Sequence, residues 1–274
     1  YAAERSAFPI YGNAVQAILK DNTLELTPSF FEIMAAKDSV GSKFKRLQSA
    51  NAFSYNLSEW QKKDTLTRPF ITSDSLFVKL LSKSLGNEVV LANEIREEFP
   101  WEEHYSKDDA QLYRALLQDS DNGIAEALLL MIGQEEFKEM DSQKAIDSIL
   151  FRWKPWLLDP IVWVDGSGVS RYNMITPRTL VGVLQKIEET VGWKTIQSYF
   201  PQGASSGTLK KYANTSVYAK TGTLRHNRNL SGYLVHPKGI TYAFSIMVNH
   251  HTAKTEEVRA GIGTLLKWLE RKLK

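Results

Sequence analysis

The sequence contains no cysteine, so disulfide bonds and thiolate-ligated metal sites are excluded. It has no apolar run approaching the roughly 20 residues that a membrane-spanning helix needs. Neither sign of charge predominates, since the chain has 34 basic and 31 acidic residues. No cluster of basic residues alternates with aromatic residues. Nucleic acid is therefore not indicated as a partner. Internal repeats and low-complexity tracts are also lacking, and the composition that remains is that of an ordinary globular protein.

The start of the chain shows no signal peptide, and it begins with Tyr1 rather than methionine. We therefore expect a processed or truncated product. The lack of cysteine fits the cytoplasm and a cell envelope equally well.

Residues 1–72 differ in pattern from the rest of the chain, because short β-branched and aromatic runs dominate and turn residues separate them. They predict a small, mainly β domain. The strands are expected over residues 8–11, 14–19, 23–27, 48–57 and 65–71.

From Ser73 the apolar spacing becomes helical, and it predicts a second domain over residues 73–274. Gly86 ends the first helix, and Thr176-Pro177 opens a later one, since proline suits a first helical turn. Helices are expected over residues 76–85, 108–117, 123–131, 174–192 and 255–272, with a strand at 89–91 and a strand hairpin at 230–236 and 240–249.

A strand beginning at Ser216 leads into Lys220-Thr221-Gly222-Thr223, just before that hairpin. A Lys-Thr-Gly triplet on such a strand is typical of enzymes that acylate a serine with a peptide or a β-lactam. The lysine places positive charge beside a substrate carboxylate, the threonine hydroxyls can hydrogen-bond it, and the glycine lets the ligand approach. The alternative is an ordinary edge-strand lysine followed by a turn.

The second candidate is Ser120-Asp121-Asn122, in a loop between two predicted helices. There a serine can relay a proton to a leaving nitrogen, and an asparagine amide can hold a peptide carbonyl. A helix N-cap is the alternative, since serine, aspartate and asparagine all favour that position. The Ser-x-Asn pattern alone is weak, because it also occurs at residues 49–51 and 54–56.

The order of these motifs resembles penicillin-binding proteins, and more narrowly the D-alanyl-D-alanine carboxypeptidase/endopeptidase family, peptidase family S13. Between the two motifs, the stretch Asp165-Gly-Ser-Gly-Val-Ser-Arg-Tyr-Asn173 carries much of the likeness. Residues 206–209 and 230–233 add to it. The resemblance implies an α+β, penicillin-recognising fold, an antiparallel sheet flanked by helices, with a small, mainly β inserted domain.

By the same resemblance, the intact enzyme attacks the D-Ala-D-Ala end of peptidoglycan stem peptides through an acyl-enzyme, and β-lactams inhibit it. Ser120 would relay the proton, Asn122 would orient the substrate amide, and Lys220, Thr221 and Thr223 would hold the terminal carboxylate beside Gly222. No metal or organic cofactor is implied, and the expected location is the periplasm or outer cell envelope.

The family's acylating serine and its lysine form Ser-x-x-Lys ahead of the inserted domain, and this chain is expected to begin after that point. The one such pattern here, Ser42 and Lys45, stands in a polar run with too little apolar surface for a buried helix. The domain at 73–274 would then lack its N-terminal part. A non-catalytic peptidoglycan-binding module and a serine β-lactamase remain as alternatives.

Overall fold

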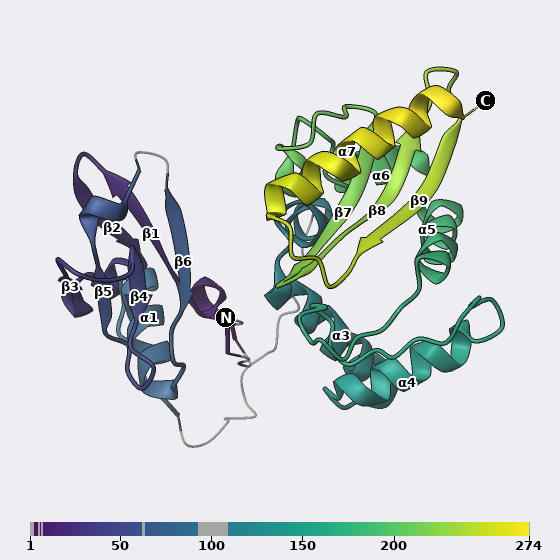
Figure 1. Ribbon diagram of the computed structural model, residues 1–274. Helices are drawn as coiled ribbons and strands as arrows, with labels where there is room; N and C mark the ends of the chain where they lie inside the picture. Colours follow the sequence, from purple (N-terminus) through teal and green to yellow (C-terminus); the bar gives the residue numbers. More distant parts are fainter. Residues whose placement is uncertain (1–2, 5, 7, 62–63, 93–108, 274) are drawn as a thin grey trace. The chain divides into compact units, whose positions relative to one another are not determined.

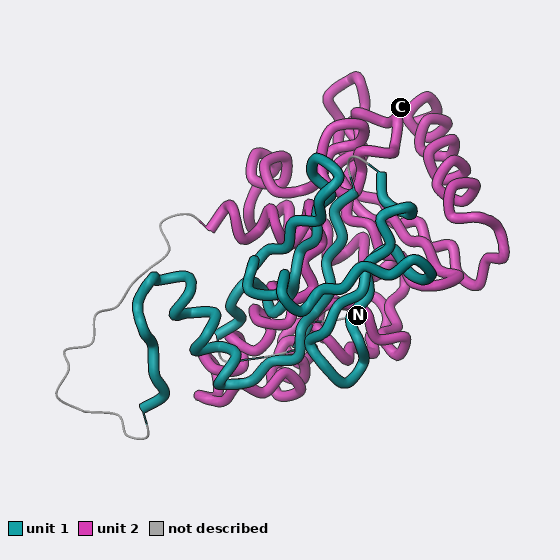
Figure 2. The backbone as a smooth tube through the Cα atoms, turned by 90° about the vertical axis from the view of Figure 1, so that its left-hand side faces the viewer, with its two compact units in different colours: residues 1–103 teal, residues 104–274 magenta. Residues whose placement is uncertain are grey.

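The computed structural model describes residues 3–4, 6, 8–61, 64–92 and 109–273. The chain forms two compact units, residues 1–103 and residues 104–274 (Figure 2).

Unit 1 is built on an antiparallel sheet of order β2-β1-β6. Its strands are β1 (Ala14–Lys20), β2 (Thr23–Thr27) and β6 (Thr65–Pro69). Val15 and Ala17 of β1 are buried whereas Gln16 and Ile18 are exposed, the period-two alternation of a strand with one covered face. Strands β1 and β2 confirm the strands predicted at 14–19 and 23–27.

A second small sheet completes unit 1, in the order β3-β5-β4. Its strands are β3 (Ala35–Lys37), β4 (Phe44–Arg46) and β5 (Phe53–Tyr55). The 3-10 helices are η1 (Ile10–Asn13), η2 (Ser29–Met34) and η3 (Leu57–Glu59). Buried aromatic side chains fill the core of the unit: Phe31, Phe44, Phe53, Trp60 and Phe70.

Helix α1 (Asp74–Leu85) also belongs to unit 1. Ser73 caps its start by accepting from the Leu76 amide at 3.2 Å, and Gly86 ends it in the left-handed conformation. Leu76 and Leu80 point into the aromatic core. The compact units therefore divide after Glu103, and the boundary at residue 72 stays a prediction about the family's domains.

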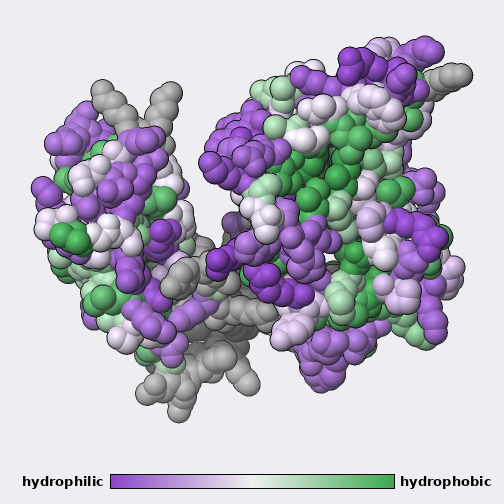
Figure 3. All heavy atoms as spheres, in the orientation of Figure 1, coloured by the Kyte–Doolittle hydropathy of each residue, from purple (hydrophilic) through white to green (hydrophobic). Residues whose placement is uncertain are grey.

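Unit 2 is organised around the antiparallel meander β7-β8-β9 (Figure 1). Its strands are β7 (Val217–Leu224), β8 (Asn227–Val235) and β9 (Thr241–Val248), as the sequence predicts for this region. Helix α7 (Thr255–Lys272) packs on one face through Ile262 and Leu266, which meet Leu230 and Leu234 of β8. In Figure 3, hydrophobic residues of unit 2 are visible over the sheet beside this helix.

The opposite face of the sheet is covered by α5 (Pro177–Val191) and α6 (Trp193–Tyr199). Tyr233 alternates with Leu234 along β8, so it points to this second face and packs with Leu184 and Ile196. The sheet thus has helices on both faces, and the predicted fold class is confirmed.

Four further elements precede α5: α2 (Asp109–Arg114), the π-helix η4 (Ala115–Asp119), α3 (Asn122–Phe137) and α4 (Ser142–Trp153). Helices α3 and α4 pack together around Leu129 and Ile146. A short 3-10 helix, η5 (Gly207–Leu209), precedes β7. None of the helices in the described ranges is long and apolar enough to cross a membrane.

We predict that the Tyr233 hydroxyl fixes α5 to the sheet. It donates to the Leu184 carbonyl at 2.7 Å in a fully buried position, and burial raises its pKa, so it stays protonated. Tyr233→Phe should lower the free energy of unfolding by about 1–2 kcal/mol in urea denaturation. The matched control is Tyr212→Phe, because the buried Tyr212 hydroxyl forms no hydrogen bond with any described residue. Equal losses in both variants would contradict this assignment.

Candidate active site

Lys220 and Ser120 are in direct contact, although 100 positions separate them in the sequence. The Lys220 Nζ donates to the Ser120 Oγ at 2.5 Å and to the Thr221 carbonyl oxygen at 2.9 Å. The contact joins the middle of β7 to the loop between η4 and α3. The two motifs singled out in the sequence, Ser120-Asp121-Asn122 and Lys220-Thr221-Gly222, therefore meet in unit 2.

The strand register explains why Lys220 points toward this loop. Lys220 follows Tyr218 by two positions, so both side chains lie on the α5–α6 face, whereas Ala219 is buried against the α7 side. Lys220 stands opposite Ser231 in β8, whose Oγ lies 2.8 Å from the Ser245 Oγ of β9. A polar row thus crosses all three strands on this face.

Ser120 is held in an uncommon backbone conformation. It has φ 60° and ψ 48°, the left-handed region, where a residue with a Cβ is strained by roughly 1–3 kcal/mol. It closes the π turn of η4, and the Asp121 amide donates to the Ala115 carbonyl at 3.2 Å. Both π turns and such strained residues are frequent at functional sites.

The helix-cap alternative applies to Asp121, the residue next to Ser120. Its side chain accepts from the Ile124 amide at 3.0 Å and starts α3. The Ser120 hydroxyl is therefore left for Lys220. Asn122 is the exposed first residue of α3, and its amide forms no hydrogen bond within the described part of the chain.

The charge of Lys220 is poorly compensated. Its side chain is partly buried, and burial lowers its pKa. Among the described residues, no aspartate or glutamate forms an ion pair with it, although an ammonium group has three N–H donors and only two are used. The arrangement is suited to an anion such as a carboxylate, which would restore the missing charge partner.

Thr221, Gly222 and Thr223 continue β7 beyond Lys220. Gly222 shares the face of Lys220, and alternation directs the two threonine side chains away from it. The Thr223 Oγ1 accepts from Arg228 at 3.2 Å. The role of these hydroxyls in holding a carboxylate stays a prediction.

The outer edge of β7 is only partly paired. The Ala219 amide donates to the Pro201 carbonyl at 3.1 Å on the side away from β8. By the same alternation, the Thr221 and Thr223 backbone amides point to this edge, where no described residue bonds them. An extended peptide could pair with this stretch of strand, beside Lys220.

The loop 165–173, the longest of the sequence motifs, is a structural support. Asp165 accepts from the amides of Gly168 and Ser170, each at 2.6 Å. The loop rests on α3, because the Ser167 amide donates to Glu126 at 3.0 Å. Gly166 allows this approach, since a Cβ there would stand 2.6 Å from the Ala125 carbonyl oxygen.

A second support reaches the turn before Ser120. Gly207 of η5 has φ +52°, and a Cβ on it would stand 2.4 Å from the Gln118 carbonyl oxygen. Sequence reasoning noticed residues 206–209 and loop 165–173 as markers, but it did not identify Glu126 or Gln118 as their contacts. The available signal was the glycine in each motif.

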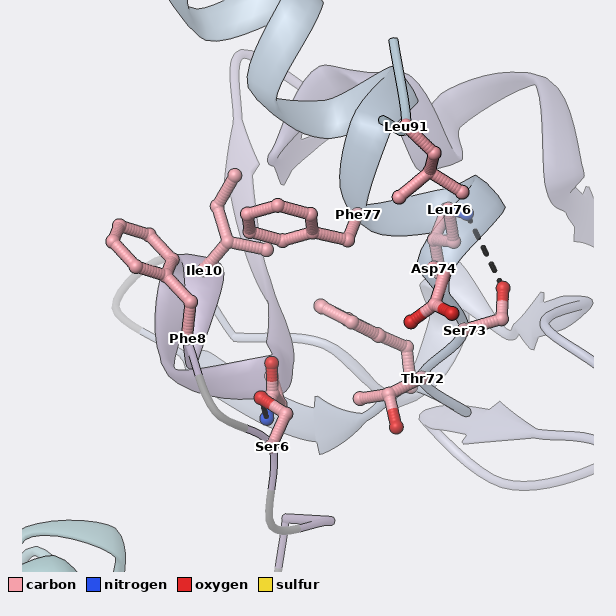
Figure 4. Close-up of a pocket in the computed structure, with 11 residues that line it drawn as sticks. Ser6, Phe8, Ile10, Thr72, Ser73, Asp74, Leu76, Phe77 and Leu91 are labelled. Carbon is pink, nitrogen blue, oxygen red and sulfur yellow. Dashed lines mark hydrogen bonds between the residues drawn. The ribbon is translucent and has the colours of Figure 1, made fainter. Parts of the chain in front are cut away.

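A cavity of about 290 Å³ in unit 1 does not contain any of these residues. It is lined mostly by apolar side chains, including Phe8, Ile10 and Phe77 (Figure 4). Of its polar lining residues, Ser73 caps α1. In the described part of the chain, no group of three or more histidine, aspartate or glutamate residues is arranged to hold a metal ion.

We predict that Gly207→Ala displaces the turn that carries Ser120, because the added methyl group collides with the Gln118 backbone. The free energy of unfolding should fall by roughly 1–3 kcal/mol, measured by urea denaturation. The control is Gly261→Ala in α7, where nothing lies within 4 Å of the new Cβ. It should raise stability by about 0.5–1 kcal/mol, since alanine favours helix. A neutral Gly207→Ala would contradict the close packing.

The chain is similar in sequence to D-alanyl-D-alanine carboxypeptidases. A D-alanyl-D-alanine carboxypeptidase from Haemophilus influenzae is 29% identical over 160 residues, which make up 54% of this chain and 33% of that protein. A D-alanyl-D-alanine carboxypeptidase from Actinomadura sp. is 31% identical over 162 residues, or 55% of this chain and 30% of that protein. The chain thus spans a third or less of the curated relatives it matches.

Among solved structures, penicillin binding protein 4 of Haemophilus influenzae superimposes with a TM-score of 0.66 at 21% identity, over 95% of this chain and 66% of that one. At this identity the likeness shows the fold. The sequence profile of the D-Ala-D-Ala carboxypeptidase 3 (S13) family matches residues 30–269, which include Ser120, Asn122 and Lys220. The chain therefore belongs to the D-Ala-D-Ala carboxypeptidase 3 (S13) family.

Proposed function

We propose that this chain supplies the substrate-recognising part of a penicillin-sensitive serine carboxypeptidase/endopeptidase, which acts on the D-Ala-D-Ala end of peptidoglycan stem peptides. The observation that carries the proposal is the partly buried Lys220 ammonium, bonded to Ser120 without a carboxylate partner among the described residues. The substrate's terminal carboxylate would be that partner. A protein that acts on peptidoglycan would be located in the periplasm or outer cell envelope.

The substrate would bind along the outer edge of β7. The terminal carboxylate would accept the remaining N–H of Lys220, and the backbone amides of Thr221 and Thr223 would pair with the extended peptide. Gly222 leaves room on the Lys220 face. Asn122, exposed at the start of α3, would bind the substrate amide.

Ser120 would carry the proton to the leaving amine. Its Oγ accepts from Lys220, so its own O–H is free to donate to the amine nitrogen as the scissile C–N bond breaks. Ser120 would then take a proton from the Lys220 ammonium. Burial lowers the pKa of Lys220, so the ammonium is a better proton donor than an exposed lysine. The acyl-enzyme is released when water attacks it.

The acylating serine itself is not supplied by Ser42. Ser42 precedes β4, which contains Lys45, so neither residue lies on a helix, and both side chains are exposed. A lysine base needs desolvation, which an exposed position does not provide. We propose that the nucleophile and its lysine belong to polypeptide outside residues 1–274. The relatives' greater length supports this proposal.

We predict that Lys220→Ala in the whole protein lowers the rate constant of acylation by penicillin by about 100-fold or more, because the carboxylate loses its charge partner. The melting temperature should change little, since the variant also removes a partly buried charge. The rate is measured with fluorescent penicillin, and Lys194→Ala, at an exposed position of α6, is the control. An unchanged rate would remove Lys220 from the carboxylate site.

We also predict that residues 1–274 alone form no covalent adduct with fluorescent penicillin after denaturation. Mass spectrometry maps any modified peptide. A label on Ser42 would show that the nucleophile lies within this chain, and a label on Ser120 would overturn its role as a relay. If a longer protein that contains a Ser-x-x-Lys helix also remains unlabelled, the non-catalytic binding module becomes the better account.

A further inference from the structure

A second cavity, in unit 2, lies between residues 211–214 and helix α7, and its volume is about 290 Å³. On the helix it is lined by positions three or four apart: Glu256, Arg259, Ala260, Gly263, Thr264 and Lys267. Such spacing places these residues on one face of α7. Ala260 and Gly263 are small, and this leaves space over the middle of that face. The cavity is close to the lower size limit of small-molecule pockets.

Asn214 is one of the lining residues, and its carboxamide is buried at the wall of the cavity. The residue is only 4% exposed, and neither Oδ1 nor Nδ2 has a hydrogen-bond partner among the residues that the structure describes. The Oδ1 lies 3.5 Å from the position that a Cβ on Gly263 would take, so the amide lies against the helix. The neighbouring Tyr212 hydroxyl is also buried and unpartnered. Unpaired buried polar groups cost free energy, and a bound polar ligand would remove that cost.

The charged residues that line the cavity are mainly cationic. Lys211, Arg259 and Lys267 face a single carboxylate, that of Glu256, and none of the four forms an ion pair with another described residue. Three cations favour an anionic ligand. The Asn214 Oδ1 accepts only, so the same ligand must also carry an N–H or O–H donor.

We propose that this cavity is a binding site for a carboxylate with an adjacent amide N–H, as found at the C-terminal residue of a peptide. The carboxylate binds Arg259 and the two lysines, and the amide N–H donates to the Asn214 Oδ1. Lys220 does not line this cavity, so the site is separate from the carboxylate site proposed at β7. It does not depend on that proposal.

The test uses N-acetylglycine, which has both groups in the smallest form, titrated into the ¹⁵N-labelled protein. The Asn214 side-chain NH₂ signal and the Gly263 amide signal should shift and saturate. Acetate, which lacks the amide, and N-acetylglycinamide, which lacks the charge, should each bind at least about tenfold more weakly. If neither signal moves, or if acetate binds as well as N-acetylglycine, the proposal fails.

Surface variants separate the ligand contacts from the fold. Arg259→Gln should weaken binding at least about tenfold, and Glu256→Gln should strengthen it about threefold by removing a like charge. Lys194→Gln, on α6 across the sheet, is the matched control and should change nothing. Lys220→Ala should also leave binding intact. Loss of binding in Lys220→Ala but not in Arg259→Gln would assign the ligand to the β7 site and overturn this one.

Discussion

The site depends on one contact, the hydrogen bond from a partly buried ammonium to a serine in strained backbone. Both partners are costly: Lys220 lacks a counter-charge among the described residues, and Ser120 occupies the left-handed region. Packing elsewhere in unit 2 must offset these costs. The apolar clusters on the two faces of the sheet provide this packing, because α7 covers one face and α5 and α6 cover the other. Residues that reduce stability while facing a ligand are typical of sites kept for function.

The supports around Ser120 make the contact rigid. Asp165 accepts hydrogen bonds within loop 165–173, and the loop donates one to Glu126 of α3. Gly207 of η5 packs against the backbone of Gln118. Both approaches depend on a glycine, so loop 165–173 and residues 206–209 hold the site rather than react in it. Such support suits the proton relay that we propose, since its donor and acceptor must keep their distance and direction.

The sequence predicted elements whose signal is local. Helix α7 runs from Thr255 to Lys272 as expected, because acidic residues begin it, basic residues end it, and its apolar face repeats. The strand predicted at 8–11 is wrong, since Tyr11 and Gly12 have positive φ and η1 forms there. Residues 89–91 are not a strand either, and α4 and α6 were not predicted. The family resemblance assigned Ser120 and Lys220 to one site, whereas the contacts of Glu126, Gln118 and Asn214 depend on tertiary packing that no local pattern encodes.

The most direct test of the account is an NMR titration of the Lys220 side chain, with the resonance assigned through Lys220→Arg. In the free protein, the account predicts a pKa below the ordinary lysine value of 10.5, since burial disfavours the charged form. A ligand ending in D-alanine should raise that pKa, because its carboxylate stabilises the ammonium. An ordinary pKa that the ligand leaves unchanged would contradict the central claim that Lys220 is held uncompensated for a substrate carboxylate.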